Sequence, residues 1–154
     1  MLTNYQLENE ELSWIEQSGL ATTEKFVLRL TLIAWKLLCH IARQLDTSVE
    51  ELTAEQIRDW LMADAKIRKE VGVSAAVLQW NDDPPDLEFS DQRQDCFTST
   101  TLTSHEKFLG RLLVSAPQVL VPIAEKYQLS VSQLTAQQII SVAQQDRNCL
   151  QWQN

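Results

Sequence analysis

Few residues in this chain have the types and spacing that catalysis requires. Cys39 and His40 are adjacent and could suggest a thiolate–imidazole pair. Adjacent residues of a helix do not face each other, and a free cysteine is among the residues most often buried. We therefore interpret both as structural core residues. No Ser/His/Asp arrangement and no pair of carboxylates stands out, so the sequence predicts that the protein is not an enzyme and has no catalytic residue and no cofactor.

A run of acidic residues in the middle of the chain is the second candidate for chemistry. Asp82, Asp83, Asp86 and Glu88 could gather a cation. A calcium loop, however, needs alternating ligands and a glycine at its sharp turn, whereas two prolines stiffen this segment. We predict no metal site and interpret the arm 82–95 as a docking element for a protein partner with a basic surface, because charge raises the rate of encounter.

Aromatic residues add to this predicted partner-binding site. The chain has five tryptophans, which is many for 154 residues. Trp60 and Trp80 lie before the acidic run, and exposed aromatic side chains anchor protein interfaces. The other interpretation places the tryptophans in the core or half-buried at its rim. As an exposed pair, Trp60 and Trp80 join the four acids as candidate partner-binding residues.

Composition restricts the class of protein. The formal charge is −8, apolar residues make up 44% of the chain and charged residues 22%, which is typical of a globular protein. An acidic chain is a poor default binder of nucleic acid or of an anionic membrane. Three widely spaced cysteines without a C-x-x-C motif predict neither a disulfide framework nor a zinc site, and favour a cytoplasmic protein.

The sequence predicts neither a targeting signal nor a membrane-spanning helix. Residues 1–19 carry four glutamates and lack a basic start and an apolar run, so we expect no signal peptide. The stretch Phe26–Ala42 is apolar but is interrupted by Arg29, Lys36 and His40. It is too short and too charged to span a bilayer, and we expect no membrane partner.

An internal repeat is the strongest feature of the sequence. When the chain is shifted by 82 residues, 24–58 aligns with 106–140 without a gap, and 16 of 35 positions are identical. Average residue usage gives about two identities by chance in such a window. The sequence therefore predicts two copies of one helical unit of about fifty residues: a first copy over 22–72 and a second copy over 104–152.

Both copies have the same predicted helices. Apolar residues recur at steps of three or four from Phe26 to Leu45, which is the period of a helix face, and the width of this stripe indicates a buried helix. Two capping boxes follow in each copy and lead into final helices at about 53–69 and 135–148. They are Ser48-x-x-Glu51, Thr53-x-x-Gln56, Ser130-x-x-Gln133 and Thr135-x-x-Gln138.

Two prolines distinguish the second copy. Pro117 and Pro122 replace Trp35 and His40 of the first copy. Because a proline inside a helix removes a hydrogen bond and clashes with the preceding turn, we expect the long first helix to be divided here. The predicted pieces are about 105–115 and 122–128.

We predict one all-α helical domain over 1–154, in which the two copies pack about a pseudo-twofold axis. Residues 1–21 precede the first copy and contain an amphipathic helix at 5–18 that ends at Gly19. Residues 81–103 form an acidic, exposed linker. The charge is −4 over 1–75, −5 over 76–103 and +1 over 104–154, so the second copy is nearly neutral.

The stretch Ile123–Leu134 resembles the helix-turn-helix of phage-repressor-like regulators. Ala124 takes the small-residue position, Leu129 and Leu134 take apolar positions, and Ser130 takes the start of the second helix. The first copy offers Ala42, Leu45, Ser48 and Leu52 in the same frame, while Asp46 and Gln128 stand where glycine is usual. The resemblance implies DNA contacts by the following residues: Lys126, Ser132, Gln133, Gln137 and Gln138.

Two functions remain as the main interpretations, and nothing in the sequence points to the third, an enzyme that acts through buried carboxylates. The acidic charge and the absence of a recognisable catalytic constellation favour a regulatory or adaptor protein that works by binding another protein. The alternative is a DNA-binding regulator that uses residues 122–140. Glu50 and Glu51, at the equivalent positions of the first copy, would repel phosphates and favour the first interpretation.

Overall fold

A computed structural model gives the structure of this protein and describes residues 9–72, 75–76 and 95–145. No strand occurs within these ranges, and the all-α class is confirmed. The helices, in chain order, are α1 (Asn9–Glu16), α2 (Thr22–Gln44), the short 3₁₀ helix η1 (Val49–Glu51), α3 (Ala54–Glu70), α4 (Ser104–Ser115), α5 (Pro117–Lys126), the 3₁₀ helix η3 (Val131–Gln133) and α6 (Ala136–Gln145).

The chain divides into two compact units. One comprises Met1–Gln6 and Leu52–Val114, and the other comprises Leu7–Glu51 and Ser115–Asn154. We call them the α3–α4 unit and the α2–α6 unit after their main helices. Each unit combines elements of both predicted copies, and the duplication and its twofold axis stay predictions.

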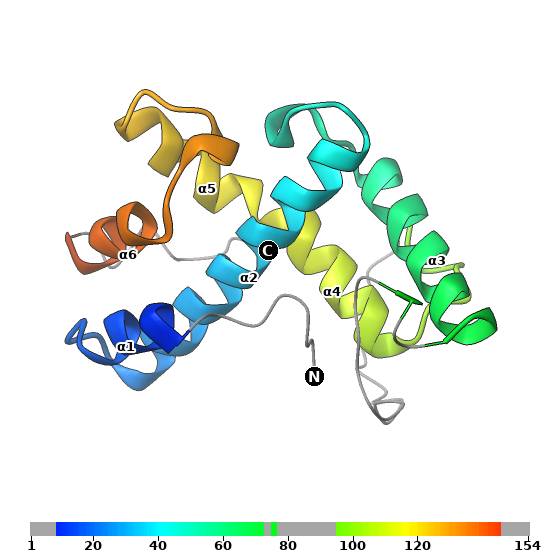
Figure 1. The fold of residues 1–154 in the computed structure, drawn as a ribbon, viewed down its shortest axis with the longest axis horizontal. Coiled ribbons are helices and arrows are strands. Elements are labelled where there is room, and N and C mark those ends of the chain that lie inside the picture. Colours follow the sequence, from blue (N-terminus) through cyan, green and yellow to red (C-terminus); the bar gives the residue numbers. More distant parts are fainter. Residues whose placement is uncertain (1–8, 73–74, 77–94, 146–154) are drawn as a thin grey trace. The chain divides into compact units, whose positions relative to one another are not determined.

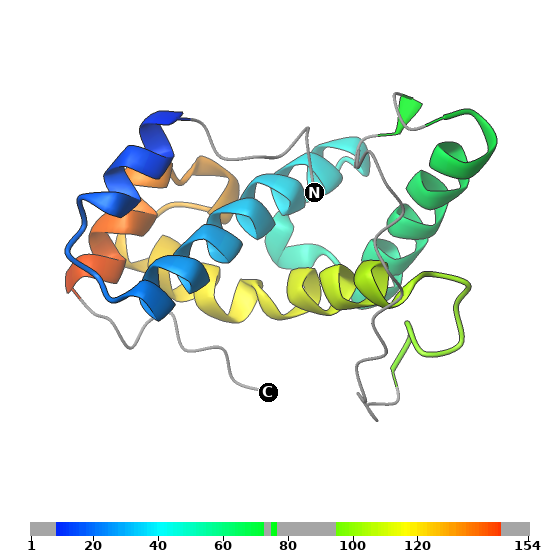
Figure 2. The same cartoon turned by 90° about the horizontal axis from the view of Figure 1, so that it is seen from below.

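Helix α2 forms the centre of the α2–α6 unit. Helices α1 and α6 pack against α2 and against each other, and α5 contacts α6, η1 and η3 (Figures 1 and 2). Each large aliphatic side chain that is fully buried contributes about 1.5–3 kcal/mol to folding. Those buried here include Ile15, Leu28, Leu32, Leu37, Leu38, Ile41, Leu120 and Ile139. Phe26 and Leu45, which we expected on this buried stripe, are 57% and 41% exposed because they lie near the two ends of α2.

The α3–α4 unit includes part of the segment that we expected to be an exposed linker. Phe97 is only 1% exposed, and Leu102 is also buried. The Asp95 carboxylate accepts hydrogen bonds from Arg111 Nε at 2.8 Å and from Arg111 Nη2 at 3.2 Å. This hydrogen-bonded guanidinium holds the pKa of Asp95 below its usual value. Phe97 and Leu102 are therefore packed into this unit, whereas Asp95, Ser99 and Thr101 are exposed as expected for a linker.

Local backbone features coincide at positions 82 residues apart. The peptide N–H of Thr47 donates to Ala42 O at 2.9 Å, and that of Leu129 donates to Ala124 O at 3.0 Å. The boxes at Thr53 and Thr135 both close in the predicted way. At Ser130 the Gln133 side chain reaches back to the Ser130 N–H at 3.0 Å, whereas Glu51 contacts the Thr47 hydroxyl.

Asp46 and Gln128 occupy the same left-handed conformation. Their φ angles are 55° and 57°, and each follows the end of a helix, α2 or α5, in a Schellman motif. In the helix-turn-helix that the stretch Ile123–Leu134 resembles, glycine is usual at this position of the turn, and here Asp46 and Gln128 adopt the left-handed conformation that glycine favours. Their side chains bear a strain that glycine would not.

This strain gives a first prediction. Replacing Gln128 by valine is expected to lower the free energy of unfolding by about 1–2 kcal/mol, because a β-branched residue is strongly disfavoured in the left-handed region. Replacing Gln128 by glycine is the matched control and is expected to cost nothing. Urea unfolding of the two variants checks this, and equal stabilities would show that the turn does not constrain position 128.

The long helix expected in the second copy is broken where predicted, between α4 and α5, but α5 does not begin where predicted. Helix α4 ends at Ser115 and α5 begins at Pro117, whereas we expected the second piece to begin at 122. Pro117 is the first residue of α5, where its missing N–H has no intrahelical partner to lose. Pro122 lies inside α5, so one proline divides the helix and the other is accommodated in it.

Helix α1 also differs from the predicted helix 5–18. The described part is Asn9–Glu16, and residues 5–8 lie outside the described residues. Ile15 is fully buried, but Leu12 is 37% exposed and Glu11 is buried. Lys36 Nζ on α2 lies 2.5 Å from Glu11 Oε1, and this ion pair accounts for the buried carboxylate. Gly19 has a φ of 79°, as expected for a residue that ends a helix.

Candidate protein-binding surface

The predicted partner-binding residues are largely outside the described part of the chain. Asp82, Asp83, Asp86, Glu88 and Trp80 all lie in 77–94, and the acidic arm therefore stays a prediction. Trp60 lies on α3 and is half-buried.

The residues of the DNA-binding alternative lie on three elements of the α2–α6 unit. Lys126 ends α5, Ser132 and Gln133 belong to η3, and Gln137 and Gln138 lie in the first turn of α6. The recognition helix that the resemblance implied from Ser130 is wrong, whereas the final helix predicted from about 135 is present as α6. Residues 131–133 form a single 3₁₀ turn, after which α6 begins at Ala136. The Thr135 cap explains this, because it starts a new helix at that point.

Several polar groups proposed for DNA contact are used within the fold. The side-chain oxygen of Gln133 accepts a hydrogen bond from the Ser130 N–H, and that of Gln138 accepts one from the Thr135 N–H at 2.9 Å. Lys126 Nζ donates to Gln145 Oε1 at 3.3 Å. Gln133 and Gln138 thus cap helices, and Lys126 forms a hydrogen bond at the surface of the unit.

The peptide of Val131 fixes η3 in the α2–α6 unit. Trp35 Nε1 on α2 donates a hydrogen bond to Val131 O at 2.9 Å. The Val131 N–H donates to Glu50 Oε2 on η1 at 3.3 Å, and the Val131 side chain is fully buried. Two elements from the first half of the chain therefore position the turn that precedes α6.

The opposite end of α6 is attached to the segment after α1. The Gln144 side-chain amide donates to Ser18 O at 3.2 Å. Arg29 and Lys25 of α2 form ion pairs with Glu16 at 2.6 and 3.5 Å, which are exposed and contribute little to stability. The rest of the unit therefore contacts α6 at Gln144 and positions the turn that precedes its first residue.

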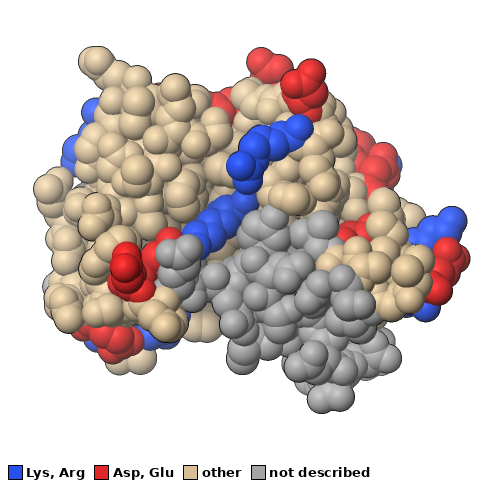
Figure 3. Space-filling model, in the orientation of Figure 1, with Lys and Arg blue, Asp and Glu red and all other residues tan. Residues whose placement is uncertain are grey.

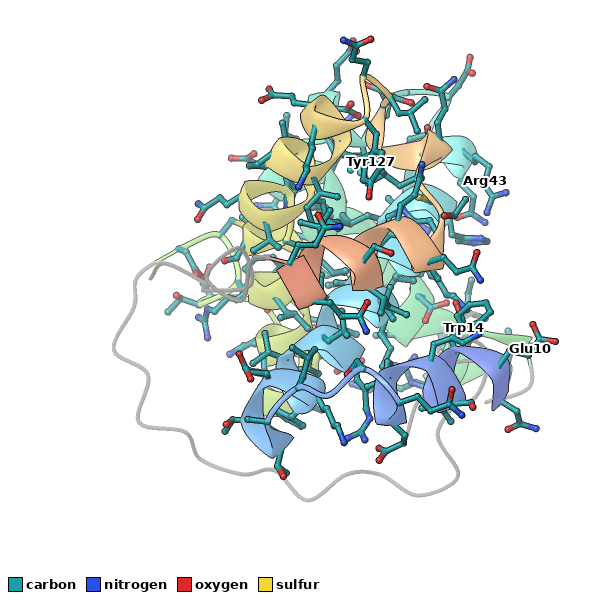
Figure 4. The ribbon with its side chains drawn as sticks, turned by 90° about the vertical axis from the view of Figure 1, so that its left-hand side faces the viewer. Glu10, Trp14, Arg43 and Tyr127 are labelled. Carbon is teal, nitrogen blue, oxygen red and sulfur yellow. The ribbon has the colours of Figure 1, made fainter. Side chains whose placement is uncertain are left out.

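Partly exposed aromatic residues lie around this face. Figure 4 shows Trp14 of α1 and Tyr127, the residue that caps α5, on the side of the unit where α6 lies, with Glu10 and Arg43 near the edge of the view. Trp14 and Tyr127 are half-buried, whereas Glu10 and Arg43 are exposed. Trp, Tyr and Arg are the residue types that most often anchor protein interfaces.

The segment from Tyr127 to the end of α6 has no charged side chain of its own, although Lys126 contacts Gln145 and Glu50 contacts the Val131 N–H at its edges. From Tyr127 to Gln145 the chain has no Asp, Glu, Lys or Arg. Few charged residues are seen over α5, η3 and α6 in Figure 3, a view turned by 90° from that of Figure 4. We give the name uncharged surface to the exposed residues of η3 and α6 together with Thr135, which lies between these two helices. They are Ser132, Gln133, Thr135, Gln137, Gln144 and Gln145.

Cys39 does not have the environment of an activated thiol. Burial raises the pKa of the Cys39 thiol to about 11, with a smaller lowering by Arg43 and a further raising by Glu50. A thiol that stays protonated is a poor nucleophile, in agreement with a structural role.

The Cys39 pKa predicts a slow reaction and a stability change at high pH. Iodoacetamide at pH 8 is expected to alkylate Cys39 about a hundredfold more slowly in the native protein than in urea, because the thiolate fraction is lower. Since the native pKa of about 11 lies above the ordinary 9.0, the native state should also lose stability as the pH rises between these values. Peptide mapping by mass spectrometry measures the alkylation; equal rates would contradict the buried thiol, and Cys39→Ala is the control for the stability change.

The described ranges contain no group of three or more His, Cys, Asp or Glu residues placed to hold a metal ion. By length and hydropathy, 106–126 is the one stretch of the described chain that could cross a membrane, and 44% of its most apolar window is buried inside the structure. A core helix of a globular protein passes the same test, so this stretch carries no assignment.

The fold and the surface together define an all-α protein with a firmly supported, uncharged face bordered by aromatic residues. The family model described as NDH complex assembly factor CRR9 matches residues 7–150. The chain therefore belongs to this family of NDH complex assembly factors. Neither the comparison with curated proteins nor that with solved structures gives a match.

Proposed function

We propose that this protein is a non-catalytic adaptor that promotes assembly of the NDH complex by binding one of the complex's protein components. The observation that carries the proposal is the family match over 7–150, which covers all described helices. The uncharged surface with its aromatic border supports it, because that arrangement suits protein contact. No observation favours the DNA-binding alternative.

The two copies take different parts in this proposal. We attribute them to duplication of one helical unit, supported by the 16 identities and by the matching turns at Asp46 and Gln128. The first copy supplies α2 and η1, which support η3 through Trp35 and Glu50. The second copy supplies the surface that meets the partner. The acidic arm at 82–95 remains a proposed additional contact for a basic partner in the cytoplasm.

Loss of the protein in its native host tests the function. We expect the amount of assembled NDH complex, measured by native gel electrophoresis and immunoblotting, to fall when the gene is deleted and to return when the wild-type gene is restored. Levels of an unrelated complex serve as the control. An unchanged amount of NDH complex in the deletion strain would contradict the proposed function.

A further inference from the structure

The uncharged surface has a matched counterpart within the same chain. The segment 45–63, which lies 82 residues before 127–145, carries six charged residues. At the aligned positions the later segment has only uncharged residues, including Gln128 for Asp46 and Gln137 for Glu55. The charged positions are Asp46, Glu50, Glu51, Glu55, Arg58 and Asp59, and their partners are Gln128, Ser132, Gln133, Gln137, Ile140 and Ser141.

This difference is not a requirement of the local backbone. Both segments have the same left-handed residue, the same 3₁₀ turn and the same Thr–Gln capping box. Glu55 and Gln137 are both exposed and occupy the same position after their caps. Segment 45–63 shows that this backbone tolerates charged side chains. The absence of charge from segment 127–145 therefore calls for an explanation outside the fold.

Contact with a partner supplies that explanation. An unpaired charge costs several kcal/mol when a partner removes it from water, and the centres of protein interfaces are depleted of charge. The side-chain oxygens of Gln133 and Gln145 are already bonded within the fold, but their amide nitrogens can donate hydrogen bonds across an interface at a lower desolvation cost than charged side chains. Trp14 and Tyr127, both half-buried on this side of the unit, add aromatic contact area.

We propose, on the basis of the proposed assembly function, that the uncharged surface is the docking site for an uncharged, hydrogen-bonding face of an NDH protein component. The charge of the chain argues for another protein rather than a second copy. At a net charge of −8, two copies repel each other, whereas a partner with an uncharged contact face avoids both repulsion and the cost of desolvating charge.

The experiment places a charge of either sign on the surface. Gln137→Glu and Gln137→Lys are introduced into the native host, together with the matched controls Glu55→Gln and Glu55→Lys. Circular dichroism of each purified variant establishes that its thermal midpoint is unchanged. We expect both Gln137 variants to reduce the amount of assembled NDH complex at least about threefold, because each buries an unpaired charge, and the Glu55 variants to leave it at the wild-type amount.

The outcomes separate this proposal from the proposed function. If deletion of the gene lowers the NDH complex but neither Gln137 variant does, the surface proposal is overturned and the function stands. Opposite effects of lysine and glutamate at position 137 would show a partner that recognises charge, which also overturns it. A wild-type dimer in sedimentation velocity that Gln137→Glu dissociates would assign the surface to a second copy instead.

Discussion

Replacing Arg68 by methionine is expected to lower the free energy of unfolding by about 3–5 kcal/mol. In the α3–α4 unit, Arg68 Nη1 lies 3.1 Å from Asp64 Oδ2, and Nη2 contacts the Glu106 carboxylate. The side chain of Arg68 is 8% exposed, and those of both acids are 4% exposed. Methionine would fill much of the same volume but would leave two buried carboxylates without this cation.

Glu106 makes the cost larger than that of an ordinary ion pair. Its Oε1 accepts a hydrogen bond from the Thr103 N–H at 2.9 Å, so the same carboxylate that pairs with Arg68 also caps α4. The matched control is Lys69→Met on the exposed neighbour, with an expected change within about 0.5 kcal/mol. Urea unfolding followed by circular dichroism measures both variants. A loss below about 1 kcal/mol for Arg68→Met would contradict the structural role of this cluster.

Replacing Gly110 by alanine is expected to destabilise the protein by about 2 kcal/mol, although alanine is the better helix former. A Cβ at position 110 of α4 would lie 2.4 Å from Phe97 Cε1 and 2.8 Å from Phe97 Cζ. Because the ring is 1% exposed, it cannot move out into solvent, and its neighbours in the core must shift with it. The overpacking cost therefore exceeds the gain of about 1 kcal/mol in helix propensity.

A smaller residue at position 97 distinguishes this clash from other effects. In a Phe97→Leu background, Gly110→Ala is expected to be neutral or stabilising, because the ring atoms that it would meet are gone. Thermal and urea unfolding of the four proteins in this cycle give the coupling between the two sites. If Gly110→Ala raised the thermal midpoint of the otherwise wild-type chain, the close packing of α4 on Phe97 would be wrong.

Features that depend on neighbouring residues could be predicted from the sequence. The Thr53 and Thr135 caps involve partners only three residues away, and both are present as expected. The division of the long helix before Pro117 follows from the chemistry of proline itself. Pro122 does not end α5, because its effect depends on how the helix is supported by the rest of the unit.

Features that depend on distant contacts could not be predicted. Phe97 stands alone among polar residues, and nothing in that pattern indicates that it packs on Gly110. The buried position of Glu11 depends on Lys36, 25 residues away. The capping boxes predicted a final helix at about 135–148, and α6 begins at Ala136. The resemblance, in contrast, implied a helix that starts at Ser130, where the structure has a 3₁₀ turn.

A photo-crosslinking amino acid placed at position 137 in the living host shows which protein lies against the uncharged surface. The same amino acid at the equivalent position 55, which is also exposed, is the control, and the crosslinked products are identified by mass spectrometry. We expect a crosslink from position 137 to an NDH component and none from position 55. If the protein supports NDH assembly with the crosslinker at position 137 but forms no crosslink to any NDH component there, the uncharged surface is not where the partner binds.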